Sequence, residues 1–290
     1  MMSYDIVAVG AISRDRNVVM GQEEVRYGGG SYCAAFAAYA AGCTTAVITK
    51  LAKDDFASLA PFQEVDIPVF STISTQTTSI KNVYSTPDLD RRTCFVMAMA
   101  EPFRKEDFPQ DLHAEIYQIA ALIAGEVPLD VLKFLAQKGQ IGLDVQGFLR
   151  TAKGHDLELR DWQDKYEAFP LIDFLKTDAA EAEMLTGYAD RSYALQALTE
   201  MGAQEIVLTH SSEVMAYAEG KIYRAPFKPR NLSGRTGRGD TCFAAYLSQR
   251  LHHAPEESLK FAAALTSLKM ETPGPFRGRV EDVRALLATY

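Results

Sequence analysis

The chain has 290 residues, of which 47% are apolar and 23% charged, and its formal net charge is −8. This composition supports a folded core, and the acidic excess argues against nucleic acid as a partner, because binding a nucleic-acid backbone usually needs a basic face. It does not argue against small anionic ligands, which need only a local positive site. No apolar run is long enough to cross a membrane, and the start shows no signal peptide. The four cysteines are far apart and form no CxxC pair, which favours buried free thiols. We therefore expect a soluble, cytoplasmic protein with no membrane partner.

Short apolar runs alternate with helical patterns along the chain. Continuous runs rich in Ile, Val and Leu are typical of strands that are covered on both faces, and their alternation with helices predicts a mostly parallel sheet. The expected strands are 5–10, 45–49, 120–124, 141–144, 174–176 and 206–209, and the expected helices are 31–41, 129–138, 181–185, 193–201 and 257–269. The fold class is α/β, in a single domain over 1–290.

Two segments interrupt this alternation. Residues 13–27 and 69–99 are rich in β-branched and polar residues and lack helical periodicity, which predicts antiparallel strands with one solvated face. We expect them to form a small β lid beside the main domain. An exposed lid edge could pair with a second subunit, so a homodimer through the lid is an open possibility. Trp162, in a charged segment, is expected at the surface.

The segment SGRTGRGDTCFAAYL (233–247) places three glycines before a carboxylate and a helical pattern. In one interpretation the glycines form a loop and Asp240 caps the helix. A P-loop would need Gly-Lys-Ser/Thr, and a dinucleotide fingerprint would follow the first strand, so neither fits. In a functional interpretation the loop amides bind an anion at the helix start, and Asp240 accepts a proton from a hydroxyl. From this segment alone, the cap and the functional interpretation are equally supported.

A second glycine-rich helix start lies early in the chain. The sequence RYGGGSYCAAFAAYAA (26–41) places Gly28, Gly29 and Gly30 before an alanine-rich helix. Two such starts fit a site with one region for a phosphoryl acceptor and one for a donor.

Together these motifs resemble the ribokinase-like (PfkB) family of sugar and nucleoside kinases. The late motif GRTGRGD (234–240) is similar to the family's D-T-x-G-A-G-D, and the early glycines match its Gly-Gly helix start. DVQGFLR (144–150), KTDAAE (176–181) and TPG (272–274) resemble further family segments, in the same order along the chain. The resemblance covers nearly the whole chain and implies transfer of the γ-phosphoryl of ATP to a hydroxyl.

The resemblance also implies residue roles. Asp240 would be the general base, and Gly237, Arg238 and Gly239 would complete the catalytic loop, whose amides form the anion hole. Asp178 and Glu181 would organise Mg²⁺ through water. The implied acceptor-binding residues are Asp15, Gly28, Gly29, Gly30, Asp144, Gln146 and Arg150. The implied nucleotide-binding residues are Asp178, Thr209, Thr236, Gly237, Gly239 and Gly274.

The chain also departs from the family pattern. Gly234 replaces the first Asp of the late motif, which puts the family's monovalent-cation site in doubt, and Arg238 replaces a small residue. Asp178 stands for an Asn. With GGGSYCAA, DVQGFLR and RRTC, these changes resemble the myo-inositol kinase branch, so a cyclitol or other polyol is the favoured acceptor.

Two alternatives remain. A nucleoside kinase of the same family would need an aromatic clamp for a base, which Tyr27, Tyr32 and Phe36 could form. A sugar or nucleotide sensor that kept the fold but not catalysis would explain the altered motif positions. The retained Asp240 favours an enzyme, because a binding module needs no base.

Overall fold

A nine-stranded sheet runs through the middle of the molecule. The computed structural model describes residues 2–84 and 92–290. The strand order is β15 (Lys221–Pro226), β14 (Glu213–Ala218), β13 (Glu205–Thr209), β12 (Phe174–Asp178), β9 (Gln140–Asp144), β8 (Leu112–Ile119), β1 (Met2–Val9), β4 (Thr45–Leu51) and β5 (Val69–Ile73). All neighbours are parallel except β13–β14 and β14–β15, which are antiparallel. This confirms the predicted mostly parallel α/β sheet.

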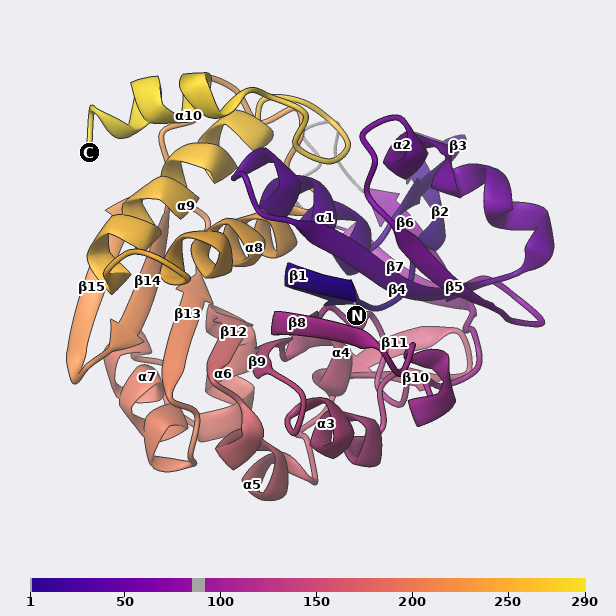
Figure 1. The fold of residues 1–290 in the computed structure, drawn as a ribbon, viewed down its shortest axis with the longest axis horizontal. Helices are drawn as coiled ribbons and strands as arrows, with labels where there is room; N and C mark the ends of the chain where they lie inside the picture. The colour runs from indigo at the N-terminus through magenta and orange to yellow at the C-terminus, as the bar shows by residue number, and fades with distance from the viewer. Residues whose placement is uncertain (1, 85–91) are drawn as a thin grey trace.

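Helices cover both faces of the large sheet (Figure 1). One layer holds α1 (Gly30–Ala40), α8 (Arg238–Arg250), α9 (Pro255–Lys269) and α10 (Val280–Leu287). The other holds α3 (Leu129–Leu135), α5 (Lys165–Ala168), α6 (Ala179–Thr186) and α7 (Arg191–Glu200). Short helices, α2 (Ala60–Gln63) and α4 (Gln146–Leu149), and the 3-10 turns Lys53–Leu59, Lys105–Asp107 and Phe169–Leu171 complete the described elements.

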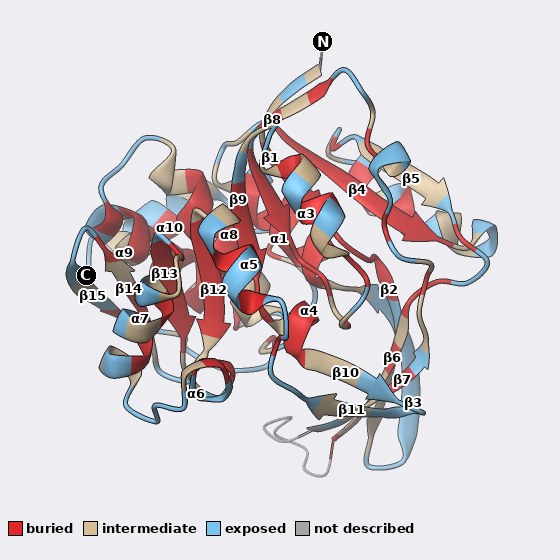
Figure 2. Cartoon of the chain, turned by 90° about the horizontal axis from the view of Figure 1, so that it is seen from below, coloured by how far each residue is buried: buried red, intermediate tan, exposed pale blue. Residues whose placement is uncertain are grey.

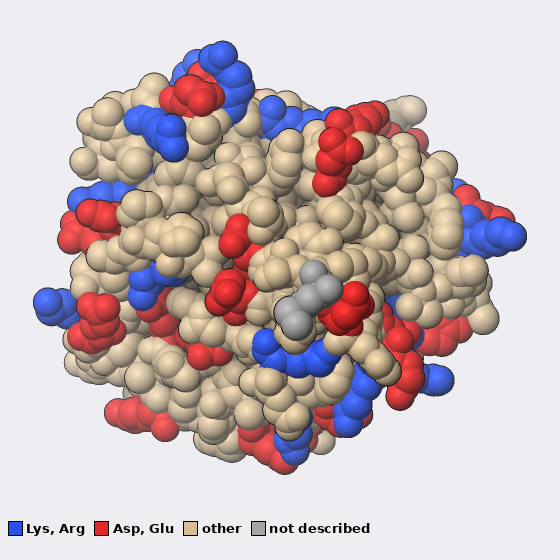
Figure 3. Space-filling model, viewed as in Figure 1, with Lys and Arg blue, Asp and Glu red and all other residues tan. Residues whose placement is uncertain are grey.

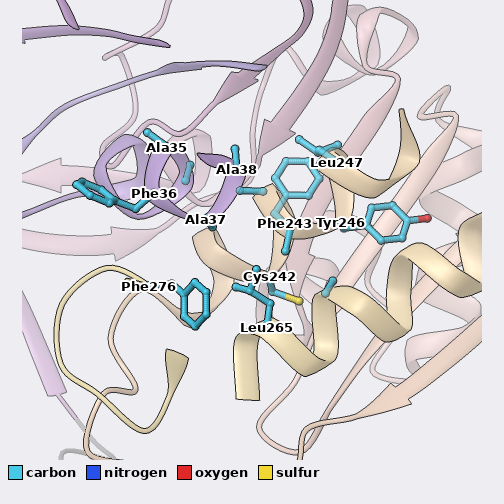
Figure 4. Close-up of a cluster of buried hydrophobic side chains, with 14 of the residues drawn as sticks. Ala35, Phe36, Ala37, Ala38, Cys242, Phe243, Tyr246, Leu247, Leu265 and Phe276 are labelled. Carbon is cyan, nitrogen blue, oxygen red and sulfur yellow. The ribbon is translucent and has the colours of Figure 1, made fainter. Parts of the chain in front are cut away.

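The small residues of α1 allow it to pack closely on α8. Ala37 and Ala38 lie on the side of α1 toward Phe243 and Leu247 of α8 in the cluster drawn in Figure 4. Every residue from Gly30 to Ala38 is buried, so helix-period amphipathicity is absent here. The burial of this run of mostly small residues brings the starts of α1 and α8 together.

A six-stranded sheet forms the lid. Its order is β10 (Arg150–Lys153), β11 (Asp156–Leu159), β7 (Arg92–Ala98), β6 (Ser79–Tyr84), β2 (Ser13–Val19) and β3 (Gln22–Gly28). Neighbours are antiparallel except β2 and β6, which are parallel. The lid strands are mostly intermediate or exposed, whereas the large-sheet strands are largely buried (Figure 2). The predicted lid therefore exists, although part of the 69–99 segment, residues 85–91, lies outside the described residues.

Three sequence predictions about these elements were wrong. A strand was expected at 120–124, but the strand in this region, β8, ends at Ile119, and the buried residues that follow it form a loop. The prediction missed β8 because its residues alternate between polar and apolar. Val69–Ile73 pairs with β4 in the large sheet rather than with the lid. Trp162 is buried, with its ring centroid 4.4 Å from that of Phe148. A tryptophan's large apolar area favours burial even when its chain neighbours are charged.

The surface carries charges of both signs. In Figure 3, Lys and Arg are interspersed with Asp and Glu across the visible face. Among the described residues, no helix has the length and apolar character needed to span a bilayer.

Candidate active site

The two glycine-rich helix starts meet at one point. A Cβ placed on Gly30, the first residue of α1, would lie 2.8 Å from Oδ1 of Asp240 in the first turn of α8. A Cβ on Gly237 would lie 2.5 Å from Sγ of Cys33 in α1. Residues more than 200 positions apart therefore lie side by side, and the two glycine-rich helix starts meet.

Asp240 does not cap its helix. The N-cap of α8 is Gly237, in the left-handed region with φ 81°, and Asp240 is the third helical residue. The cap interpretation of the sequence is therefore wrong. Gly237 takes this conformation at low cost, and the amides of Gly239 and Asp240 have no acceptor within the helix. The helix start is an anion-binding geometry with a carboxylate beside it.

Lys176 lies beneath this loop and was not predicted as a site residue. Its Nζ is 3.0 Å from Oδ2 of Asp144 and 3.9 Å from Oε2 of Glu181, and all three side chains are buried. A Cβ on Gly239 would lie 3.1 Å from the same Nζ. Burial opposes the charge of Lys176, but the attraction of Asp144 and Glu181 outweighs it and raises the pKa of Lys176. Lys176 thus remains an ammonium next to the glycine-rich loop that begins α8.

The predicted acceptor-binding residues fall into two groups. Asp15, on β2, lies next to Gly28, whose added Cβ would be 3.6 Å from Oδ2 of Asp15. Asp144 is instead turned into the core toward Lys176, and burial raises the pKa of its carboxyl, although Lys176 opposes this effect. The amide of Gln146 donates to Oδ1 of Asp144 at 3.0 Å. Arg150 begins the lid strand β10 and is half-buried.

Comparison with known proteins identifies the family of this chain. The sequence profile of the pfkB family carbohydrate kinases matches residues 1–279. The chain belongs to this family. No curated protein sequence matches.

Solved structures agree with this family assignment. A pyrophosphate-dependent kinase of the ribokinase family, complexed with a pyrophosphate analog and myo-inositol, is 37% identical with a TM-score of 0.89, over 97% of this chain and 99% of that one. A variant in which two substitutions convert a pyrophosphate-dependent myo-inositol-1 kinase into a myo-inositol-3 kinase is 36% identical with a TM-score of 0.87, over 98% and 99%. Arabidopsis thaliana ribokinase with ribose and ATP, at 19% identity, a TM-score of 0.76 and 99% of both chains, shares the fold.

In this pfkB-family chain, the residues expected to organise Mg²⁺ form a helix cap. Asp178 is the N-cap of α6, and its Oδ1 accepts the amide of Glu181 at 2.9 Å. Oε2 of Glu181 accepts the amide of Asp178 in return, at 2.8 Å. Burial raises the pKa of Glu181 to about 7, with Lys176 opposing the rise. Asp178 is half-buried, so of the two carboxylates it is the one open to a hydrated cation.

The predicted nucleotide-binding residues lie in the loop itself and at or after the ends of β12, β13 and α9. Thr236 is linked to the lid, because its Oγ1 is 3.3 Å from the hydroxyl of Tyr84. Thr209 ends β13 and is buried. Gly274 has φ 89° and open space where a side chain would start. Arg238 extends toward the β13–β14 turn, where its Nη1 donates to the carbonyl of Ser211 at 3.5 Å.

Of the three rings considered as an aromatic clamp for a nucleoside acceptor, two are buried in the core and Tyr27 is exposed. Tyr32 and Phe36 are buried and pack on Phe62, with ring centroids 4.9 and 5.2 Å from its own. The hydroxyl of Tyr27 donates to Oδ1 of Asp55 at 2.7 Å. These rings are therefore held by contacts within the protein.

Proposed function

We propose that this pfkB-family kinase transfers a phosphoryl group from pyrophosphate to a hydroxyl of myo-inositol or a closely related cyclitol. The observation that carries the proposal is the position of Asp240. Its carboxylate lies between the start of α1 and the anion-binding start of α8. A general base and an anion hole at one point suit phosphoryl transfer to a hydroxyl.

Each group then has a defined task. The acceptor hydroxyl donates its proton to Asp240 as its oxygen bonds to phosphorus, and the bond to the bridging oxygen of pyrophosphate breaks, which releases orthophosphate. The amides of Gly239 and Asp240 stabilise the charge on the transferring phosphoryl oxygens. Lys176, buried below Gly239, adds a fixed positive charge in a low-dielectric region.

The acceptor would bind between α1 and the lid. Asp15 and Gly28 face this side, and β2 and β6 add polar side chains, with Nδ2 of Asn82 donating to Oδ1 of Asn17 at 3.0 Å. Hydroxyls around a cyclitol ring need several such donors and acceptors. The lid also excludes water, which would otherwise compete for the phosphoryl group.

The donor would bind on the opposite side of the loop. Asp240 faces α1, whereas Arg238 reaches the β13–β14 turn and lies 5.8 Å from the ring centroid of Phe227. A guanidinium suits a highly charged donor without a nucleoside, because such a donor relies on charge for its binding. The 36–38% identity to kinases described as pyrophosphate-dependent supports the same donor.

Magnesium would be held mainly through water. Within residues 2–84 and 92–290, no three His, Cys, Asp or Glu side chains form a metal-binding group. Asp178, with the donor's own oxygens, fits a hydrated Mg²⁺, which usually keeps several waters. The ion would neutralise charge on the donor. ATP is the second candidate donor, because ribokinase-fold structures with ATP share this architecture.

An assay of donor against acceptor tests the proposal. Inositols, hexoses, pentoses and nucleosides are each incubated with Mg²⁺ and either pyrophosphate or ATP, and products are identified by phosphorus NMR. We expect myo-inositol phosphate from pyrophosphate. Asp240→Asn should lower kcat by about 10²–10⁴-fold, the usual contribution of a general base, while pyrophosphate still binds. Turnover that survives Asp240→Asn contradicts the mechanism, and binding without turnover on any acceptor favours a sensor.

A further inference from the structure

A buried ammonium lies directly behind the catalytic loop. Lys269 is the last residue of α9, and it is 1% exposed. Its Nζ donates hydrogen bonds to the carbonyls of Gly234 and Thr236. Its Cε is 3.8 Å from the position of a Cβ on Gly237, the N-cap of α8. The side chain therefore connects α9 with the segment that leads into the anion hole.

Lys269 differs from the other buried lysines in its partners. Lys50, Lys165 and Lys176 each have a carboxylate oxygen 2.7 to 3.0 Å away. In the part of the chain that the structure describes, no carboxylate oxygen lies within 4.0 Å of Lys269 Nζ. Burial lowers the pKa of Lys269, and the nearby Cys33 and Asp240 oppose the effect. A buried charge without an ion pair is costly, so its retention needs another explanation.

The geometry of the peptide bond relates this charge to the anion hole. In a trans peptide the carbonyl and the following N–H point in opposite directions. When Lys269 holds the carbonyl of Thr236 on the α9 side, the amide of Gly237 is turned away from α9. The carbonyl of Gly234 and the amide of Arg235 are related in the same way.

Gly234 contributes by having no side chain. A Cβ at this position would lie 1.9 Å from the carbonyl oxygen of Thr272 and 2.8 Å from that of Lys269. The backbone here is too close to the end of α9 for any side chain, so the aspartate of the family motif could not be accommodated at position 234. The positive charge beneath the loop is the ammonium of Lys269.

We propose that Lys269 is a positioning residue for phosphoryl transfer, and that its ammonium fixes the loop carbonyls so that the loop amides face the donor phosphate. This inference rests on the proposed function. Because the ammonium is part of the chain, the enzyme needs no added monovalent cation for activity.

Chemical rescue tests this role. Lys269→Ala removes the ammonium and leaves a cavity, and we expect kcat to fall about 100-fold, as when one anion-hole donor is lost. Added methylammonium or ammonium should raise the kcat of this variant at least about tenfold. Tetramethylammonium, which has no N–H donor, should not raise it. Lys165→Ala is the matched control, since Lys165 is also buried and its Nζ donates to a carbonyl, that of Leu185, at 2.8 Å.

Two further measurements separate positioning from folding. Lys269→Met keeps the apolar stem, so its melting temperature should stay nearer that of the natural chain while kcat falls. The natural chain should have the same kcat with and without added K⁺ or NH₄⁺, a result that needs no variant. A requirement for added cation, full activity in Lys269→Met, or a loss that no amine restores in a folded Lys269→Ala would each overturn the proposal.

The affinity for the donor, pyrophosphate, can be measured without turnover, so it tests the role of Lys269 separately from the proposed function. If no acceptor is phosphorylated, the proposed function fails, and Lys269 is judged by calorimetric titration with pyrophosphate. An affinity at least about tenfold weaker in Lys269→Met than in Lys165→Met supports the role in the anion site. Equal affinities overturn it, and a natural chain that binds neither pyrophosphate nor ATP overturns both proposals.

Discussion

The starts of α1 and α8 look alike in sequence but use their glycines for different physical reasons. At the start of α1, a Cβ on Gly29 would lie 2.3 Å from the carbonyl oxygen of Ala11, and one on Gly30 would lie 2.8 Å from that of Ala120. These glycines allow a close crossing of backbones. At the start of α8, Gly237 supplies a left-handed N-cap, and Gly239 approaches the side chain of Lys176.

The comparison shows that two similar glycine-rich motifs at one site have different roles: the α1 start allows close packing, and the α8 start provides a positive electrostatic environment. The close approach at Gly30 brings α1 to the Asp240 carboxylate. The α8 start orients amides and has two buried ammonium groups beneath it, those of Lys176 and Lys269. Substitutions should therefore affect stability most at the first start and catalysis most at the second.

The largest expected effect is from Gly29→Ala. Gly29 has φ 102° and a backbone oxygen in the place of the new methyl group, so we expect a loss of more than about 4 kcal/mol in the free energy of unfolding. Gly21→Ala is the matched control, because Gly21 has φ 80° but no atom within 4 Å of the added Cβ. It should cost only about 1 to 2 kcal/mol. Equal costs in urea unfolding would show that conformation, rather than close approach, determines the α1 start.

Gly237→Ala should have an intermediate effect that depends on Cys33. The new methyl group would overlap Sγ of Cys33, and the backbone has φ 81°, so we expect a cost of about 3 kcal/mol and a fall in kcat. In a Cys33→Ala background the overlap is absent, and the cost should fall by about 1 kcal/mol or more. A double-mutant cycle measures this coupling. Additive losses would mean that the two helix starts do not touch in solution as they do here.

The smallest expected effect concerns Glu126, whose Oε2 accepts the amide of Leu122 at 2.7 Å in the loop that backs the α1 start. Burial raises the pKa of Glu126 to about 7, although hydrogen bonds from Leu122, Ala11 and Ile123 oppose the rise. The folded protein then keeps a proton that the unfolded chain releases from about pH 4.3 upward, so stability falls as pH rises toward 7.

Glu126→Gln should remove this dependence, because the amide carries no charge and its oxygen still accepts the same bond. Relative to the natural chain, we expect the variant to gain about 2 kcal/mol between pH 5 and pH 7, which urea unfolding at several pH values would measure. The kcat at pH 5 should change little. A constant difference between the two proteins across this range would show that Glu126 is already ionised in the fold.

Much of the fold was predictable from local patterns. Continuous buried runs such as 45–49 and 206–209 lie in β4 and β13, because strands covered on both faces need apolar residues at every position. The strand predicted at 120–124 is in fact β8 at Leu112–Ile119, because polar residues in the first half of β8 hide its strand pattern. The edge strand β5 was assigned to the wrong sheet, because its composition resembles that of the lid and only its pairing with β4 distinguishes it.

The sequence by itself determined the order of motifs, the α/β alternation and the two glycine-rich helix starts, because these depend on residue type and spacing along the chain. The tertiary structure decided that Gly237 rather than Asp240 caps α8, and that Lys176 and Lys269 lie beneath the loop. The physical reason is that a buried lysine has no local signal. Its role depends on which carbonyls and carboxylates the packing of distant helices and strands brings around its ammonium.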